Sequence, residues 1–205
     1  MAKKESTFGN MLLALLVISL VSSTALGFVY EFTKEPIRMV EINRTNTAIQ
    51  AVVPEFNNMP ATESFKVSTD QDSLRFYPAK KDGILVGTAV ETYTKKGFSG
   101  LIKLMVGFAP DGKIIDISVL QHQETPGLGD KIEKSKSSFS AQFQGKNPAT
   151  FRLIVKKDRG DVDAITASTI SSRAYCDAVK RAYDAYMRSS KSKSEESKSE
   201  GENEF

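Results

Sequence analysis

The chain has little of what metal, cluster and nucleotide sites are usually built from. Its 205 residues include one cysteine, one histidine and no tryptophan. One cysteine excludes an internal disulfide and an iron–sulfur cluster, and no Cys/His cluster surrounds His122 to bind zinc. Cys176 shares a helical face with Val179 and Tyr183, which predicts core packing. Neither a dinucleotide-binding Gly-x-Gly-x-x-Gly nor a P-loop sequence occurs, so we expect no metal and no nicotinamide.

The charge of the chain is low and evenly mixed. Lysine and arginine number 28 and aspartate and glutamate 25, a net charge of +3. Because acidic and basic residues are interspersed, the sequence has no cluster of basic residues of the kind that binds nucleic acid, and we expect no nucleic-acid partner. The length suits one globular domain with an appendage.

The appendage is an apolar N-terminal stretch. No charged side chain occurs from Ser6 to Tyr30, and about 20 apolar residues span the hydrocarbon core of a bilayer. The pattern predicts a transmembrane anchor in membrane lipid over residues 8–30, after a short cytoplasmic segment, residues 1–7. A signal peptide cleaved near residues 25–27 is the alternative, but the apolar run continues past that point and favours a retained anchor.

The rest of the chain predicts an α+β domain over residues 31–188, mainly antiparallel sheet with flanking helices. Helical spacing covers Glu35 to Val53, and residues 57–72 read as a loop with a short helix. Strands are expected at residues 84–90, 101–108, 113–120 and 151–156, and helical patterns at residues 131–143. From residue 189 to 205 the chain is almost entirely Ser, Lys, Glu, Asn and Gly, which predicts a disordered polar tail.

Five hydroxyl side chains precede the last patterned helix, within seven residues. They are Thr166, Ser168, Thr169, Ser171 and Ser172. One interpretation is a helix N-cap, since Ser and Thr satisfy free N–H groups at a helix start. The other is a phosphate site, because the same N–H groups and the helix dipole stabilise an anion. A threonine hydroxyl there could also be esterified to the phosphate.

A second motif reads His122-Gln-Glu-Thr-Pro-Gly-Leu-Gly129. Thr125-Pro126-Gly127 predicts a turn, with proline presetting φ and glycine supplying a left-handed residue. Glycines at 127 and 129 would let a flat ring approach the backbone. An ordinary turn before a helix is the alternative when this segment is taken alone.

Together, in this order and spacing, the two segments resemble those of the FMN-binding domain family. The hydroxyl segment is similar to the family's flavin-attachment motif, Ser-Gly-Ala-Thr-x-Thr/Ser-Ser. The corresponding positions are Thr166, Ala167, Ser168, Thr169, Ser171 and Ser172, with Thr169 at the flavin-carrying threonine. Ala167 departs from a glycine that adopts positive φ easily. Ser168 places a second hydroxyl beside the acceptor, so the attachment atom stays open between Ser168 and Thr169.

The resemblance implies a function as well as a cofactor. It implies FMN attached to Thr169 by a phosphoester, with a pocket formed by Glu124, Thr125, Pro126, Gly127, Leu128 and Gly129. It also implies a separate flavin transferase that uses FAD and a divalent cation. Within the family, the chain resembles flavoprotein subunits of ion-translocating electron-transport complexes of the Rnf type and of sodium-pumping NADH:quinone reductases. Other membrane subunits of such a complex are then the partners, and the domain lies on the periplasmic side of the inner membrane.

Two other functions remain open at this point. The first is a stand-alone extracytoplasmic flavin reductase, supplied with electrons by a quinone or another carrier. The second is an anchored scaffold without flavin, in which the hydroxyl segment is only a helix cap. The sequence has no nucleophile–base arrangement of its own, so we expect an electron relay with no catalytic residue.

Overall fold

The computed structural model describes residues 7–69 and 72–201, with side chains up to residue 191. Two compact units meet after Arg44, inside the first helix. The helices and strands, in chain order, are α1 Phe8–Val52, β1 Phe65–Ser68, β2 Ser73–Lys81, β3 Ile84–Gly97, β4 Gly100–Phe108, β5 Ile114–His122, the short 3₁₀ helices η1 Gly129–Ile132, η2 Phe139–Phe143 and η3 Lys156–Asp158, and α2 Thr169–Gly201.

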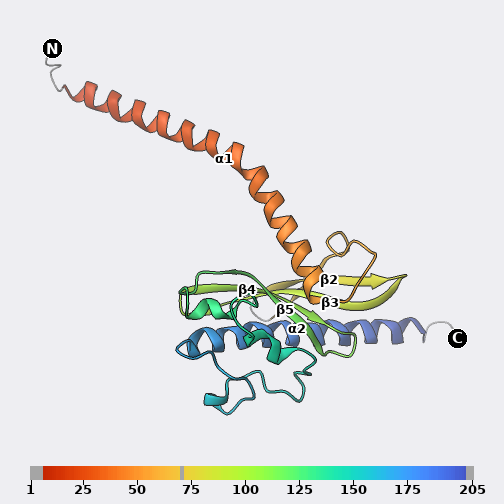
Figure 1. The fold of residues 1–205 in the computed structure, drawn as a ribbon. Coiled ribbons are helices and arrows are strands. Elements are labelled where there is room, and N and C mark those ends of the chain that lie inside the picture. Colours follow the sequence, from red (N-terminus) through yellow and green to blue (C-terminus); the bar gives the residue numbers. More distant parts are fainter. Residues whose placement is uncertain (1–6, 70–71, 202–205) are drawn as a thin grey trace. The chain divides into compact units, whose positions relative to one another are not determined.

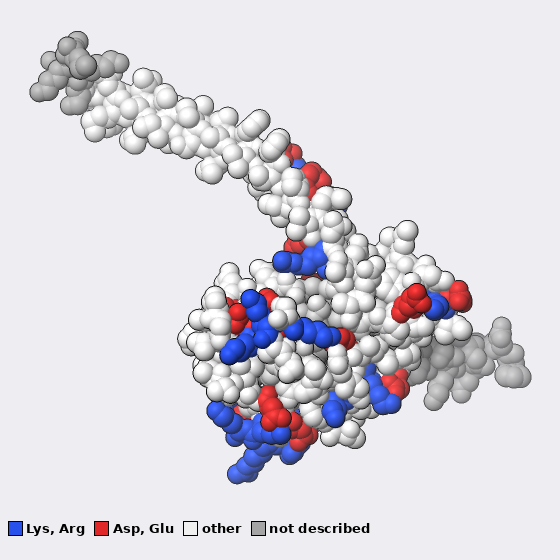
Figure 2. Space-filling view, in the orientation of Figure 1, with Lys and Arg blue, Asp and Glu red and all other residues white. Residues whose placement is uncertain are grey.

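The first unit is the long N-terminal part of α1. Among the described residues, α1 is the one helix long and apolar enough to cross a membrane, and its most apolar window has a mean hydropathy of 2.4. Its side chains before Glu31 are exposed and uncharged (Figure 2). Ser19 and Thr24 donate to the carbonyls of Leu15 and Leu20, at 2.8 and 2.7 Å. These bonds satisfy hydroxyl groups that an apolar environment would otherwise leave unpaired.

The structure joins two segments that the sequence suggested as separate helices. The expected anchor and the expected helix from Glu35 are parts of the single helix α1, with Pro36 inside it. The first charged pair along the helix is Lys34 with Glu31, one turn apart. The uncharged stretch therefore ends at Tyr30, where the sequence predicted the end of the anchor.

The second unit contains one antiparallel sheet with strand order β1-β2-β3-β4-β5 (Figure 1). Every strand pairs with its sequence neighbour, so short turns connect the sheet and no crossover is needed. The β4–β5 hairpin turns at Asp111-Gly112, where Gly112 has a φ of +81°, as the sequence predicted. The α+β class with a mainly antiparallel sheet is confirmed.

Both faces of the sheet are covered. On one face α2 packs its apolar residues, such as Tyr175 and Val179, against strand residues such as Phe76 and Leu104. On the other face the last turns of α1 contribute Ala48, Ile49 and Val52 to a second buried cluster. Side chains alternate between the two faces of the sheet, so β2 to β5 each supply both clusters, whereas β1 adds Phe65 and Val67 to the first cluster alone.

Three local expectations differ from the structure. Residues 131–143 form two 3₁₀ helices rather than a continuous helix, and Ser137 Oγ donates to the Lys131 carbonyl at 2.6 Å, an alternative to helical hydrogen bonding. Residues 151–156 form no strand, and a single β-bridge joins Val155 to Val162. The backbone N–H of Arg152 donates to the Asp161 carboxylate instead of to a neighbouring strand. The segment expected to be a loop contains β1.

The C-terminal segment also differs from the expectation of disorder. The structure continues α2 to Gly201, through most of the polar tail that begins at residue 189. Lysine and glutamate have high helix propensity, which favours continuing an existing helix even where no core is buried. Residues 202–205 lie outside the described part of the chain.

The single cysteine is part of the core, as predicted from its helical face. Cys176, on α2, is buried in the core that α2 forms with the sheet. Burial raises the pKa of its thiol to about 12. At neutral pH this thiol is therefore protonated and packs as a small apolar side chain.

Candidate functional site

The hydroxyl segment forms the start of α2. The helix begins at Thr169, and its first backbone bond runs from the Ser172 N–H to the Ser168 carbonyl at 3.0 Å. The N–H groups of Thr169, Ile170 and Ser171 precede that bond and so lie at the open end of the helix. A helix N-terminus with free N–H groups favours an anion.

Ser172 holds this helix start in place. Its Oγ donates to the Ser168 carbonyl at 2.9 Å and accepts from the Ile165 N–H at 2.9 Å. The side chain is fully buried. Both contacts are internal to the chain, so the structure gives Ser172 a role in shaping the loop before the helix.

Ala167 occupies the position where the family motif has glycine, and its backbone is left-handed with a φ of +62°. A residue with a Cβ atom costs about 1 to 2 kcal/mol in that conformation. The turn therefore keeps the glycine geometry although glycine is missing. This conformation places the next two hydroxyl residues, Ser168 and Thr169, at the helix start.

The two candidate acceptor hydroxyls differ in exposure and in neighbours. Ser168 is buried, with 7% of its surface exposed, whereas Thr169 is half-buried. The Lys157 ammonium donates to Thr169 Oγ1 at 3.3 Å. A phosphate on Thr169 would thus meet both the helix N–H groups and a cation, which favours Thr169 over Ser168.

Lys157 lies in η3, and an ion pair holds η3 against α2. Arg173 donates to both carboxylate oxygens of Asp158, at 2.6 and 2.8 Å. These hydrogen bonds lower the pKa of Asp158. Sequence reasoning missed Lys157, because it lies twelve residues before Thr169 with no motif around it.

His122 is the last residue of β5, and its contacts organise the second motif. Its Nδ1 accepts from the Glu124 N–H at 3.0 Å, so Nε2 carries the proton and donates to Glu133 Oε1 at 2.7 Å. The hydrogen bond from His122 lowers the pKa of Glu133. In the described residues no group of metal-binding side chains occurs, and His122 acts as a structural brace.

Glu124 is the central side chain of the site. It is buried, with 4% of its surface exposed. Its Oε1 accepts from the Ser99 N–H at 3.0 Å, and its Oε2 accepts from Ser171 Oγ. The carboxylate thereby ties together the β3–β4 hairpin, the second motif and the start of α2.

Gly129 makes room for that carboxylate. A Cβ atom at this position would lie 2.6 Å from Glu124 Oε2 and 2.9 Å from Ser171 Oγ. The second glycine of the motif is therefore explained by a close approach of side chains. The preceding turn has the predicted form, with Gly127 at a φ of +76° and the Leu128 N–H donating to the Thr125 carbonyl at 3.2 Å.

A cavity of about 310 Å³ lies where the two motifs meet. Its lining residues are Phe98, Glu124, Thr125, Leu128, Gly129, Ala167, Ser168, Thr169, Ile170 and Ser171. Most of the predicted site residues are among them. Thr166, Pro126 and Gly127, which lie in turns, and Ser172, which lies in the first turn of α2, do not line it.

Three exposed apolar side chains border the cavity. Phe98, Leu128 and Ile170 are 67%, 43% and 47% exposed. Phe98 and Ile170 were not among the predicted site residues; an aromatic residue in the tip of a Gly-Phe-Ser-Gly hairpin was the available signal for Phe98. Apolar walls with a few convergent polar groups are typical of sites for flat ring cofactors.

The residues present fit FMN. For a phosphate, the site offers the Thr169 hydroxyl, the open helix N–H groups and the Lys157 ammonium beside Thr169. For a ring system, the cavity lining offers Phe98, Leu128 and Ile170.

Residues 97–184 match the FMN-binding domain family. The G subunits of ion-translocating oxidoreductase complexes are similar over most of the chain. The Shewanella baltica protein is 34% identical over 178 residues, which cover 82% of this chain and 84% of that protein. The Vibrio cholerae protein is 33% identical over 181 residues, 84% and 87% of the two chains. The Erwinia tasmaniensis protein is 41% identical over 140 residues, 64% and 67% of the two chains.

The matched region includes both motifs, the cavity between them and the first part of α2, from Thr169 to Asp184. In two of these relatives the match covers more than four fifths of both chains. The chain therefore belongs to the family formed by the G subunits of ion-translocating oxidoreductase complexes, and it carries that family's FMN-binding domain.

Proposed function

We propose that this chain is a membrane-anchored flavoprotein subunit that relays electrons within an ion-translocating, Rnf-type complex, through FMN held covalently on Thr169. One observation carries the proposal: Thr169 is the first residue of α2, its half-buried side chain lines the cavity, and Lys157 Nζ lies 3.3 Å from its Oγ1. Bound FMN supplies the redox chemistry, and the chain supplies its position and surroundings.

The attachment is a phosphoryl transfer performed by a separate flavin transferase with FAD and a divalent cation. Thr169 Oγ1 forms a bond to the FMN phosphorus, the pyrophosphate bond of FAD breaks, and AMP leaves. The hydroxyl proton passes to a base of the transferase or to solvent. The helix N–H groups and the Lys157 ammonium then stabilise the phosphodiester charge.

The two motifs have different tasks in this proposal. Residues at the start of α2 hold the phosphate, and Thr125, Leu128 and Gly129, together with Phe98, border the ring. Glu124 keeps these segments in register through its bonds to Ser99 and Ser171. A phosphoester leaves the ring chemically unaltered, so the pocket determines its redox potential.

A relay is favoured over a stand-alone reductase by what the cavity contains. Its lining includes no nicotinamide-binding motif and no nucleophile–base pair within the described residues, and the sequence has no Gly-x-Gly-x-x-Gly. The purified flavinylated chain should be bleached by dithionite and reoxidised by an artificial acceptor, without appreciable NADH turnover. Saturable NADH oxidation that disappears in Thr169→Ala would favour the reductase.

For topology, we infer that α1 anchors the chain in the inner membrane and that the domain from Glu31 lies on the periplasmic side. Covalent attachment has a purpose there, since a dissociable cofactor outside the cytoplasm is lost by dilution. A phosphatase reporter fused after Met187 should be active and should sediment with membranes. An active but soluble, shortened product would instead indicate cleavage near residues 25–27.

Partner subunits and flavin content can be tested in one preparation. The full chain, purified in mild detergent from cells that encode the transferase, should bring the other membrane subunits of the complex with it. After denaturing electrophoresis its band should fluoresce like flavin. A non-fluorescent band, although the transferase is active on another substrate, would favour the scaffold without flavin.

A further inference from the structure

A second, more open hollow lies between the end of β3 and one face of α2, outside the flavin cavity. Its volume is about 580 Å³, and we call it the charged groove. Its lining residues are Thr69, Tyr93, Thr94, Lys95, Lys96, Asp177, Lys180, Arg181, Asp184, Ala185 and Arg188. The registered pairing of β2 with β3 ends at Arg75 and Glu91, and β3 continues to Gly97, which opens the space along α2.

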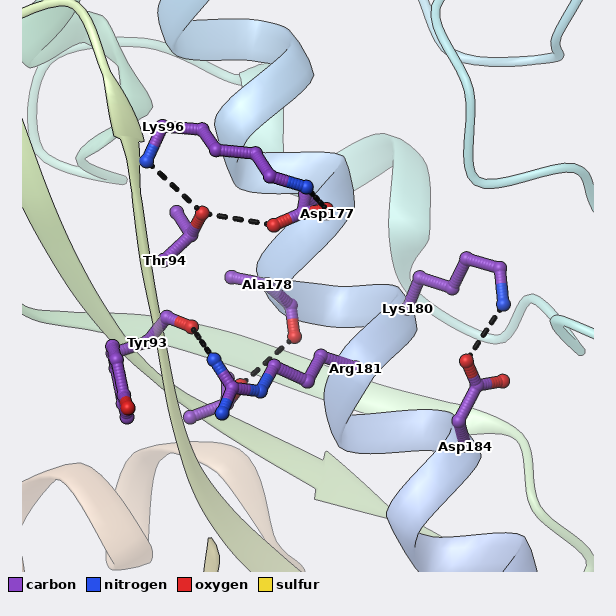
Figure 3. A network of polar contacts seen from close by, with 9 residues as sticks. Tyr93, Thr94, Lys96, Asp177, Ala178, Lys180, Arg181 and Asp184 are labelled. Carbon is purple, nitrogen blue, oxygen red and sulfur yellow. Dashed lines mark hydrogen bonds and ion pairs between the residues drawn. The ribbon is translucent and has the colours of Figure 1, made fainter. Parts of the chain in front are cut away.

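The groove carries an excess of positive charge. Five of its lining side chains are basic and two are acidic, an excess of three. Both acids are already paired within the groove: Asp177 with Lys96 and Asp184 with Lys180, each at 2.6 Å (Figure 3). Thr94 Oγ1 also donates to Asp177 at 2.8 Å. Asp72, beside the groove, interacts with Lys95 and Arg181, and the groove keeps an excess of two positive charges when Asp72 is counted with it.

Arg181 is held at the floor of the groove. Its guanidinium lies 4.5 Å from the centre of the Tyr93 ring and donates to the Tyr93 carbonyl at 3.3 Å (Figure 3). Its Nη2 is buried without a hydrogen-bond partner among the described residues, and the nearest carboxylate, Asp72, is 3.9 Å away. A fixed cation with an unused donor favours an anionic neighbour.

The groove begins beside the flavin cavity. Lys96 lines the groove, and Phe98, two residues later on the same hairpin, lines the cavity. On α2, Ser171 lines the cavity and Asp177 lines the groove, a separation of about 9 Å along the helix axis at roughly 1.5 Å per residue. Whatever occupies the groove is therefore close to the flavin cavity.

We propose that the charged groove docks an acidic segment of a partner subunit and so brings the next electron carrier beside the flavin cavity; this rests on the relay function proposed above. The shape favours a chain segment over a single ion. The lining residues on α2 run from Asp177 to Arg188, about 16 Å of helix, which matches about five residues of extended chain. Complementary charge of this kind steers and orients partners.

Carbodiimide cross-linking of the assembled complex tests the contact directly, because the reagent joins a lysine amine to a carboxylate in contact with it. We expect mass spectrometry to find Lys95 joined to an Asp or Glu of another subunit. Lys95→Arg should keep the partner subunits in the purified complex but lose this cross-link. Absence of any intersubunit cross-link at the groove lysines of an intact complex would overturn the proposal.

Charge reversal tests the energetic role. In Lys95→Glu/Lys180→Glu we expect recovery of partner subunits to fall about tenfold or more, with the largest loss at low salt, because like charges across an interface are strongly unfavourable. Lys66→Glu/Lys136→Glu is the matched control: both lysines are exposed and neither lines the groove. Equal losses in the two double variants would contradict a specific docking surface.

Two further arms separate this inference from its alternatives. Vesicles containing anionic phospholipid test whether the groove binds a membrane surface instead of a protein. If they bind the full chain through Lys95 and Lys180 while the complex assembles normally, the groove is a lipid contact and the proposal is wrong.

The Thr169→Ala variant separates docking at the groove from attachment of the flavin. If this variant loses its flavin and keeps the Lys95 cross-link, the relay function and the docking proposal both stand. If the wild-type chain carries no flavin and still forms the cross-link, the relay function is wrong and the docking proposal stands.

Discussion

The flavin cavity and the charged groove lie next to each other along α2 and are built in opposite ways. The cavity centres on a buried carboxylate, Glu124, surrounded by glycine and hydroxyl residues and bordered by apolar side chains. The groove is lined mainly by lysines and arginines, and two of the lysines, Lys96 and Lys180, pair with aspartates on the surface. The first is a cavity beside closely packed buried side chains, and the second is a charged hollow at the surface.

The difference predicts where substitutions affect the fold. Around the cavity, side chains are closely packed and a buried hydrogen-bond network depends on each of its members. Substitutions that add or remove a few atoms there should therefore lower the free energy of unfolding. In the groove, exposed ion pairs contribute little, so substitutions should affect partner binding and leave the fold intact. Each prediction below tests one side of that contrast, beginning with the largest expected effect.

Gly129→Ala should be the most damaging of these substitutions. The new Cβ would lie 2.6 Å from Glu124 Oε2 and 2.8 Å from Glu124 Cβ, and overpacking of this kind costs about 2 to 3 kcal/mol. Chemical unfolding of the full chain in detergent would measure the loss. Gly127→Ala is the control, since its Cβ has open space and only the left-handed backbone strain remains. Equal stability of wild type and Gly129→Ala would disprove the close packing.

Glu124→Ala should cost about 2 kcal/mol of folding free energy, because it leaves the Ser99 N–H and the Ser171 hydroxyl without their acceptor. Glu124→Gln keeps the volume and one acceptor oxygen and should cost less. Hydrogen exchange would localise the effect, with the Ser99 amide exchanging faster in the alanine variant. An unchanged rate at Ser99 would mean that Glu124 does not brace the hairpin.

Ala167→Gly should stabilise the protein by about 0.5 to 1 kcal/mol. Removing the Cβ relieves the left-handed strain at a φ of +62°, partly offset by the greater freedom of glycine in the unfolded chain. Ala141→Gly, at an exposed position without positive φ, should destabilise instead. Thermal unfolding of both variants decides the sign, and two shifts in the same direction would contradict the strain at Ala167.

Lys180→Ala in the groove should have the smallest effect on folding, about 0.3 kcal/mol. It removes one exposed i,i+4 ion pair with Asp184, and such pairs contribute about 0.3 to 0.5 kcal/mol. The unfolding midpoint in urea should shift only slightly. A loss above about 1 kcal/mol would place the groove among the elements that hold the fold, and would remove the contrast with the cavity.

Most residues of the predicted site come together in the fold because they lie in two short motifs. Glu124 to Gly129 and Ala167 to Ser171 are each local in the chain, and most of the residues named in them line the cavity. Lys157 and Phe98 were missed because they come from other elements and reach the site only through the fold. The positive φ at Ala167 could not be read from an alanine, which normally avoids it.

The groove could not be predicted, because its residues are scattered. Its lining residues on α2, from Asp177 to Arg188, follow helical spacing among core residues, and most of the others come from the end of β3. On the sequence they are indistinguishable from an ordinary solvated helix face. The β4–β5 hairpin was predicted from its Asp111-Gly112 turn and the alternation of its strands, whereas η1, η2 and the bridge at Val155 depend on side-chain bonds from Ser137 and Asp161.

The most direct test of the proposed function is the intact mass of the full chain produced together with the flavin transferase. The wild type should carry the mass of one FMN less one water, Thr169→Ala should carry none, and Ser168→Ala should remain largely loaded. Loss of the added mass in Ser168→Ala, with retention in Thr169→Ala, would move the attachment to Ser168 and contradict the role assigned to Thr169 and Lys157.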